Sequence, residues 1–123
     1  MFSGEELKRA TRFSVGYDIK SNVQVTLKAH VPTAIPTGVY MKAPEGYWGK
    51  IEGRSSLALK GIQVLGGIID PDYEGEVKVI LLSVKDYLVK RGDKVAQLVF
   101  LPFTAFEEAE GERGDGGFGS SGR

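Results

Sequence analysis

The sequence predicts an all-β domain, folded as a barrel or a distorted jelly roll. The 123-residue chain has 17 glycines and five prolines spread along its length, which is typical of many short strands joined by turns. Between these residues, apolar and polar side chains alternate in several stretches. No segment sustains the 3.6-residue apolar period of an amphipathic helix. Strands are therefore expected to build the core.

The expected elements can be placed in chain order. Val23, Val25 and Leu27 alternate with polar residues, which is the pattern of a half-buried strand. Helix is expected in two short pieces only, one turn within residues 4–10 and one within 54–61. Further strands are expected in five stretches that are bounded by Gly, Pro or Asp: 38–44, 46–53, 61–70, 75–84 and 87–103.

Length and composition restrict the class of protein. A chain of this size has room for one domain. Sixteen basic and sixteen acidic residues balance, so no global field favours nucleic acid or a membrane as partner. The absence of cysteine excludes disulfides and thiolate metal sites. Apolar runs stay below membrane-spanning length, and the N-terminal stretch is charged throughout, unlike a signal peptide. A soluble intracellular protein is therefore expected.

The chain is expected to divide into a β-barrel core, residues 1–106, and a flexible glycine-rich C-terminal arm, residues 107–123. The arm has little apolar surface to bury, and it ends in ERGDGGFGSSGR. A Gly/Ser-rich tail of this kind is usually disordered. Glycine-rich loops with hydroxyl side chains also cradle phosphates, because bare backbone N–H groups can approach an anion closely. Both interpretations remain open at this point.

The segment IIDPDYEGE, residues 68–76, predicts a hairpin: an apolar strand, a Pro/Asp turn, and a second strand. On composition alone it is a plain turn. The functional interpretation starts from Asp70, which is expected at the end of a strand, where rigid backbone can aim a carboxylate into a cleft. Tyr73 would then offer a flat face beside it.

The segment GRSSLALKG, residues 53–61, places a guanidinium and two hydroxyls just ahead of the second helical turn. Ser55 or Ser56 is expected to cap this turn, and Gly61 to end it. One interpretation is a capped turn with Arg54 on the surface. The other is an anion site, because a guanidinium, hydroxyls and unpaired N–H groups converge at such a position.

Two further polar residues are candidates, and one of them, Gln97, is expected within a strand. Asp18 lies in the stretch VGYDIKS, and Gln97 lies within the apolar part of RGDKVAQLVF. Amides inside strands are usually edge residues or satisfied core residues. Neither residue indicates a functional site by itself.

Taken in order, five stretches are similar to the five motifs of the trimeric dUTPase family: GYD, GRSSLA, GGIIDPDYEGE, GDKVAQLVF and RGDGGFGSSG. They run from Gly16 to Gly122 and so cover nearly the whole chain. The resemblance implies a jelly-roll subunit, a homotrimer, and three active sites at subunit junctions. The first, second and fourth motifs would come from one subunit, the third from a second, and the fifth from the third.

The resemblance also implies an activity, the hydrolysis of dUTP to dUMP and pyrophosphate. Asp70 would orient and deprotonate the water that attacks the α-phosphorus. Mg²⁺ is the expected cofactor, bound to phosphate oxygens and keeping several waters, and Asp18 would hold this hydrated ion indirectly. Contacts to the phosphates are implied for four residues: Arg54, Ser55, Ser56 and Gln97.

Recognition of the nucleoside is implied for the third motif and the strands around it. Tyr73 would pack behind the deoxyribose and leave no space for a 2′-hydroxyl. Backbone groups would pair with uracil and reject cytosine, whose exocyclic amine reverses one donor–acceptor position. A tight hairpin would exclude the methyl group of thymine. The residues implied around the base are Val64, Gly67, Ile68 and Lys78.

The resemblance implies that the arm closes over bound nucleotide and that Phe118 stacks on uracil. Only fifteen residues, 98–112, separate Gln97 from Arg113. Whether the arm reaches a neighbouring subunit or folds over its own therefore stays open. Contacts to the terminal phosphates and close backbone approach are implied for Arg113, Gly119, Ser120 and Ser121.

Two alternatives were weighed against dUTP hydrolysis. The related dCTP deaminases also carry an RSSL stretch and a DP turn, but their catalytic Glu stands ten residues after the turn Asp. Ile80 holds that position here, and an aliphatic side chain cannot transfer protons. The second alternative is a nucleotide-sensing or interaction module without catalysis. The presence of Asp70, Tyr73 and Phe118 argues against it.

Overall fold

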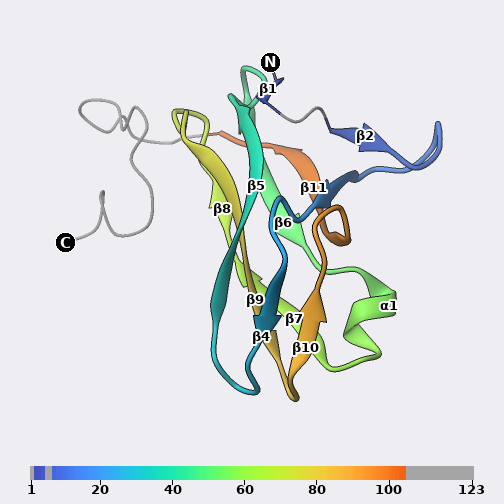
Figure 1. Ribbon diagram of the computed structural model, residues 1–123. Helices are drawn as coiled ribbons and strands as arrows, with labels where there is room; N and C mark the ends of the chain where they lie inside the picture. Colours follow the sequence, from blue (N-terminus) through green and yellow to red (C-terminus); the bar gives the residue numbers. More distant parts are fainter. Residues whose placement is uncertain (1, 5–6, 105–123) are drawn as a thin grey trace.

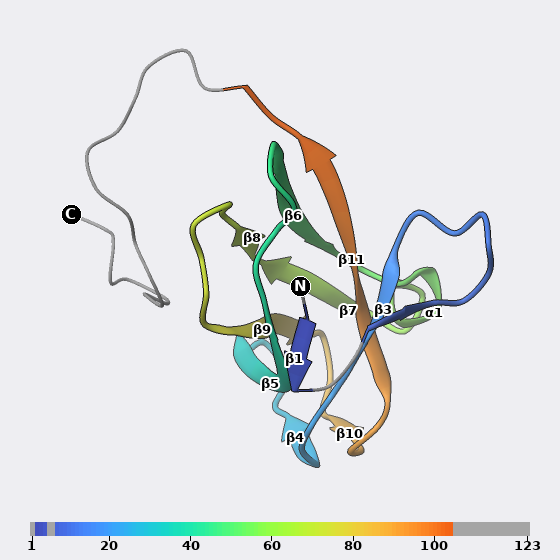
Figure 2. The ribbon, with the colours of Figure 1, turned by 90° about the horizontal axis from the view of Figure 1, so that it is seen from above.

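The computed structural model describes residues 2–4 and 7–104. Within them, the strands form two sheets that face each other, together with a short two-stranded ribbon (Figures 1 and 2). The strand pairs are antiparallel. The predicted all-β jelly-roll architecture is confirmed.

The first sheet has the order β1-β5-β9-β7 and the second the order β2-β3-β11-β6-β8, while β10 and β4 form the ribbon. A single short helix, α1, lies among the described residues. The bounds are β1 Phe2–Gly4, β2 Lys8–Arg9, β3 Tyr17–Lys20, β4 Val25–Leu27, β5 Thr33–Met41, β6 Tyr47–Glu52, α1 Ser55–Ala58, β7 Ile62–Gly66, β8 Ile68–Ile69, β9 Glu76–Ser83, β10 Tyr87–Val89 and β11 Lys94–Pro102.

The core lies between the two sheets. Along β9, Val77, Val79 and Leu81 are buried in alternation with more exposed neighbours, because successive side chains of a strand point to opposite faces. Ile19 of β3 and Leu98 of β11 fill the same core from the opposite sheet. This alternation fixes the register, since a slip of one residue would turn every apolar side chain outward.

All five predicted strand stretches contain strands, but two of them are divided. Residues 61–70 form β7 and β8, and residues 87–103 form β10 and β11. The helical turn expected within 4–10 is wrong, because Lys8 and Arg9 form β2 and pair with Asp18 and Tyr17 of β3. Local helix propensity is weak, and backbone pairing to a neighbouring strand overrides it.

The helical turn α1 confirms one expectation and corrects another. Gly61 ends it, with φ +83° and its N–H donated to the Ala58 carbonyl, a left-handed conformation that glycine adopts without strain. The serine cap is wrong: Arg54 is the N-cap residue, and no described side chain caps the turn. Over residues 2–4 and 7–104, no helix is long and apolar enough to cross a membrane.

The predicted hairpin at residues 68–76 is also corrected. β8 pairs with β6 in the second sheet, whereas β9 pairs with β5 and β7 in the first. The segment therefore crosses from one sheet to the other. Its turn is present as expected: the Tyr73 N–H donates to the Asp70 carbonyl at 3.0 Å, and Pro71 takes the second position, which its fixed φ favours.

Candidate functional site

Three of the predicted site segments come together on β3, β11 and β6. Gln97 of β11 pairs with Asp18 of β3 on one side and with Glu52 of β6 on the other. Their neighbours Ile19 and Leu98 point into the core, so Asp18 and Gln97 face the other way. The chain then leaves β6 directly into the predicted anion-binding residues at the start of α1: Arg54, Ser55 and Ser56.

The Gln97 side chain connects the first, second and fourth of these segments. Its Nε2 donates to the Gly53 carbonyl at 3.1 Å. Its Oε1 lies over Gly16, where an added Cβ would stand only 2.2 Å from that oxygen. Gly16 is therefore required for the observed position of the amide. Sequence reasoning included Gly16 only as one letter of GYD and assigned it no role.

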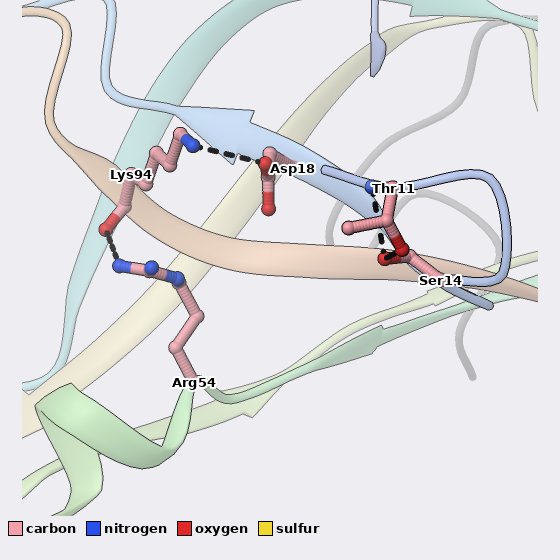
Figure 3. A network of polar contacts seen from close by, with 5 residues as sticks. All are labelled: Thr11, Ser14, Asp18, Arg54 and Lys94. Carbon is pink, nitrogen blue, oxygen red and sulfur yellow. Dashed lines mark hydrogen bonds and ion pairs between the residues drawn. The ribbon is translucent and has the colours of Figure 1, made fainter. Parts of the chain in front are cut away.

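A second contact network joins Asp18 to Arg54 through Lys94 (Figure 3). The Lys94 Nζ lies 3.2 Å from Asp18 Oδ2, and Arg54 Nη1 donates to the Lys94 backbone carbonyl at 3.1 Å. The Asp18 side chain is only 20% exposed. Lys94 was missed by sequence reasoning, although it stands inside the quoted stretch GDKVAQLVF.

A hollow of about 560 Å³ opens beside Asp18. Of the residues that the structure describes, several with cationic side chains line it, together with one carboxylate, that of Asp18. In a chain of zero net charge, this local excess of positive charge favours an anionic ligand. The cationic residues of the wall are Lys8, Arg9, Lys20, Arg91 and Lys94.

The predicted carboxylate Asp70 stands at the end of β8, on the turn between the two sheets, and is half-buried. Tyr73 lies three residues on, packed against the core. Its hydroxyl donates to the Glu76 carbonyl at 2.6 Å. These contacts hold the Tyr73 side chain in a fixed position relative to the start of β9.

The residues predicted around the base lie on β7, β8 and β9, except Gly67, which lies between β7 and β8. Val64 of β7 pairs with Leu81 of β9 and packs against the core. The Gly67 carbonyl already accepts the Ile51 N–H at 3.1 Å, so that oxygen is engaged within the chain. Ile68 is 63% exposed, and Lys78 is exposed on β9.

A single copy of the chain does not bring all predicted site residues together. The turn at 70–75 lies on the left in both views of the ribbon, and α1 lies on the right (Figures 1 and 2). Asp70 and Tyr73 are thus on the opposite side of the subunit from Arg54. The predicted arm residues lie outside the described residues: Arg113, Phe118, Gly119, Ser120 and Ser121.

The metal-binding side chains of the described residues suit a cation that is held mainly by a bound phosphorylated ligand and by water. Within residues 2–4 and 7–104, no group of three His, Cys, Asp or Glu side chains converges, so the described residues form no cage of protein ligands. Mg²⁺ characteristically keeps several waters and binds through one or two carboxylates plus substrate phosphates. Asp18, beside a cationic hollow, matches that mode of binding.

The fold and these residues define a class. A jelly roll that offers a guanidinium, two exposed hydroxyls and a fixed amide on one side, and a carboxylate on a rigid turn on the other, is a protein that binds phosphorylated ligands. The chain belongs to the dUTPase family: the family model, described as dUTPase, matches residues 3–122.

Curated relatives agree with this membership. The chain is 43% identical to a deoxyuridine 5′-triphosphate nucleotidohydrolase of Paramecium bursaria Chlorella virus 1, covering 93% of this chain and 87% of the relative. It is 41% identical to the protein of the same name from Candida glabrata, covering 90% and 84%.

Solved structures show the same fold. EIAV dUTPase superimposes with a TM-score of 0.79 at 27% identity, over 90% of this chain and 94% of that chain. A mutant dUTPase of phage phi11 of S. aureus gives 0.80 at 25% identity, over 89% and 91%. That structure is described as revealing the coordination of a structural Mg(II) ion.

Proposed function

We propose that this protein hydrolyses dUTP to dUMP and pyrophosphate through attack of water on the α-phosphorus. The observation that carries the proposal is the family match, which extends over residues 3–122 and so includes all five motif stretches. The curated relatives named above are nucleotidohydrolases of this substrate. Such an activity keeps uracil out of DNA and supplies dUMP for thymidylate synthesis, and we expect it to operate inside cells.

On the phosphate side, we assign the triphosphate to Arg54, Ser55, Ser56 and Gln97. Both serines are exposed. A guanidinium has five N–H donors, and the hydrogen bond from Arg54 to the Lys94 carbonyl uses one of them. The Gln97 amide has two N–H donors and gives one to Gly53. The remaining donors support charge stabilisation without covalent chemistry.

Asp18 is the residue that would hold Mg²⁺, through a water molecule. Its carboxylate lies opposite Gln97 on the paired strand, and among the described residues no second carboxylate lines the hollow. When bound to the phosphates, the ion would neutralise their charge. This chain contributes the carboxylate that fixes the hydrated ion and the cations that surround it.

On the nucleoside side, Asp70 is the proposed general base, and Tyr73 the proposed support of the deoxyribose. The hydrogen bond from the Tyr73 hydroxyl to Glu76 holds the ring in place. Backbone groups near Val64, Gly67 and Ile68, with Lys78 close by in the chain, would read uracil.

We further propose a homotrimer in which each site is shared. Support comes from the turn at 70–75, which carries Asp70, and α1, whose N-cap is Arg54, lying on opposite sides of one copy (Figure 1). A single copy then cannot bring both residues to one nucleotide. A heterologous contact that closes into a ring of three would bring one copy's turn to the next copy's α1. The arm would complete the site with Arg113, Phe118, Gly119, Ser120 and Ser121.

The test is to incubate the protein with dUTP or dCTP in Mg²⁺ and to assay pyrophosphate and ammonia separately. Pyrophosphate from dUTP without ammonia is the expected result. Ammonia from dCTP would contradict the proposal and indicate a deaminase. Binding of nucleotide with neither product would also contradict it and indicate a module without catalysis.

A further inference from the structure

Lys94 reaches the site because of an irregularity in β11. Against β3, Lys94 pairs with Lys20 and Ala96 pairs with Ile19, so β11 holds one extra residue, Val95. Val95 and Ala96 are both buried, at 2% and 0% exposure. In a regular strand, Lys94 would share the buried face of Ala96. The β-bulge instead turns Lys94 to the face that carries Asp18, as bulges do when they redirect a side chain.

From this position Lys94 contacts two of the proposed site residues, Asp18 and Arg54. Its ammonium pairs with Asp18, and its backbone carbonyl accepts the Arg54 guanidinium (Figure 3). The residue proposed to hold Mg²⁺ and a residue proposed to hold phosphate are thus joined through one lysine. The Lys94 ammonium therefore lies next to the Asp18 carboxylate, in the place where the charge of a bound cation would act.

We propose that Lys94 is a positioning residue whose ammonium acts as a built-in counter-ion of Asp18, which hydrated Mg²⁺ replaces when nucleotide binds. The inference rests on the proposed function. A triphosphate next to an uncompensated carboxylate is repelled, and the ammonium offsets that repulsion while the metal is absent. A lysine ammonium is a compact charge on a flexible stem, so it can withdraw, whereas an arginine fork would hold the carboxylate through two hydrogen bonds.

The experiment is a calorimetric titration with a dUTP analogue in which NH replaces the α,β-bridging oxygen. Wild type and Lys94→Met are compared in EDTA and in saturating Mg²⁺. In EDTA, Lys94→Met is expected to bind about three- to tenfold more weakly, since the partly exposed ion pair is screened by solvent. In saturating Mg²⁺ the two proteins are expected to agree within about twofold. The Mg²⁺ concentration at half-maximal binding should fall in the variant, because the competing cation is gone.

Three control variants separate this role from a general loss of charge. Lys28→Met removes an exposed ammonium that pairs with Asp86 at 3.6 Å and does not line the hollow, and it should change binding less than about twofold. Lys94→Arg keeps the charge, so it should retain binding in EDTA and require at least as much Mg²⁺ as wild type. In an Asp18→Asn background, Lys94→Met should no longer weaken binding in EDTA.

Each remaining outcome overturns the inference. If Lys94→Met matches wild type in both buffers, loses affinity equally in both, or behaves like Lys28→Met, the ammonium is not the counter-ion. Thermal midpoints of the variants verify that they are folded. If wild type binds the analogue and Lys94→Met binds it with the same affinity, this inference alone is rejected. If wild type binds the analogue in neither buffer, the proposed function is rejected as well.

Discussion

The two parts of the proposed site are built in different ways. Asp18 and Gln97 lie directly opposite each other on paired strands, so the sheet register itself fixes their spacing. Asp70 and Tyr73 lie on a turn that crosses between two sheets, and local hydrogen bonds hold them. Residues whose spacing is fixed by the sheet register suit the binding of a triphosphate, because the phosphates need hydrogen-bond donors at constant positions. A carboxylate on a turn at a subunit surface suits presentation to another copy.

The largest effect is expected on the turn side. Asp70→Asn should lower kcat by about 10²–10⁴-fold, the usual contribution of a general base, and should leave dUTP binding nearly unchanged because the amide is isosteric. The measurement is steady-state pyrophosphate release together with the dissociation constant of the NH-bridged analogue. Turnover within a few-fold of wild type would show that Asp70 is not the base.

Mixing two inactive variants tests whether the two sides belong to different subunits. Asp70→Asn and Arg54→Ala are each expected to be inactive as pure trimers. After unfolding and refolding together in equal amounts, about a quarter of the sites would pair an intact Asp70 with an intact Arg54 and regain activity. A mixture as inactive as its components would show that each subunit supplies both residues to its own site. Separately refolded and then combined variants are the control.

A smaller effect is expected where the register side is most crowded. Gly16→Ala would place a methyl group 2.2 Å from Gln97 Oε1, so the amide must move away from Gly53. We expect a loss of about 1–3 kcal/mol in unfolding free energy from overpacking and a raised KM for dUTP. The matched control is Gly53→Ala, whose added Cβ would meet only Val64 at 3.8 Å. Equal behaviour of the two variants in denaturation and kinetics would contradict this account.

Alternation was enough to predict strands in six stretches from Val23 onward, and motif order was enough to predict the family, but β1, β2 and β3 were not predicted. The crossing at residues 68–76 was not predictable, because a hairpin and a sheet-to-sheet connection share the same local turn chemistry, and only distant partners of β8 distinguish them. Lys94 was missed for a related reason. A bulge depends on pairing with Ile19 and Lys20 of another strand, and without it Lys94 is indistinguishable from a surface lysine.

The smallest effect is expected at the Tyr73 hydroxyl. Tyr73→Phe removes its hydrogen bond to the Glu76 carbonyl but keeps the ring that is proposed to support the deoxyribose. Loss of one such bond should cost about 0.5–1.5 kcal/mol of unfolding free energy. If the bond serves only to hold the turn, the decrease in kcat for Tyr73→Phe should be orders of magnitude smaller than the decrease for Asp70→Asn. Discrimination against UTP should then persist. Denaturant titration and the ratio of kcat/KM for dUTP and UTP measure both. Loss of that discrimination would show that the hydroxyl, rather than the ring, excludes the 2′-hydroxyl, and the turn would then read the sugar by a polar contact.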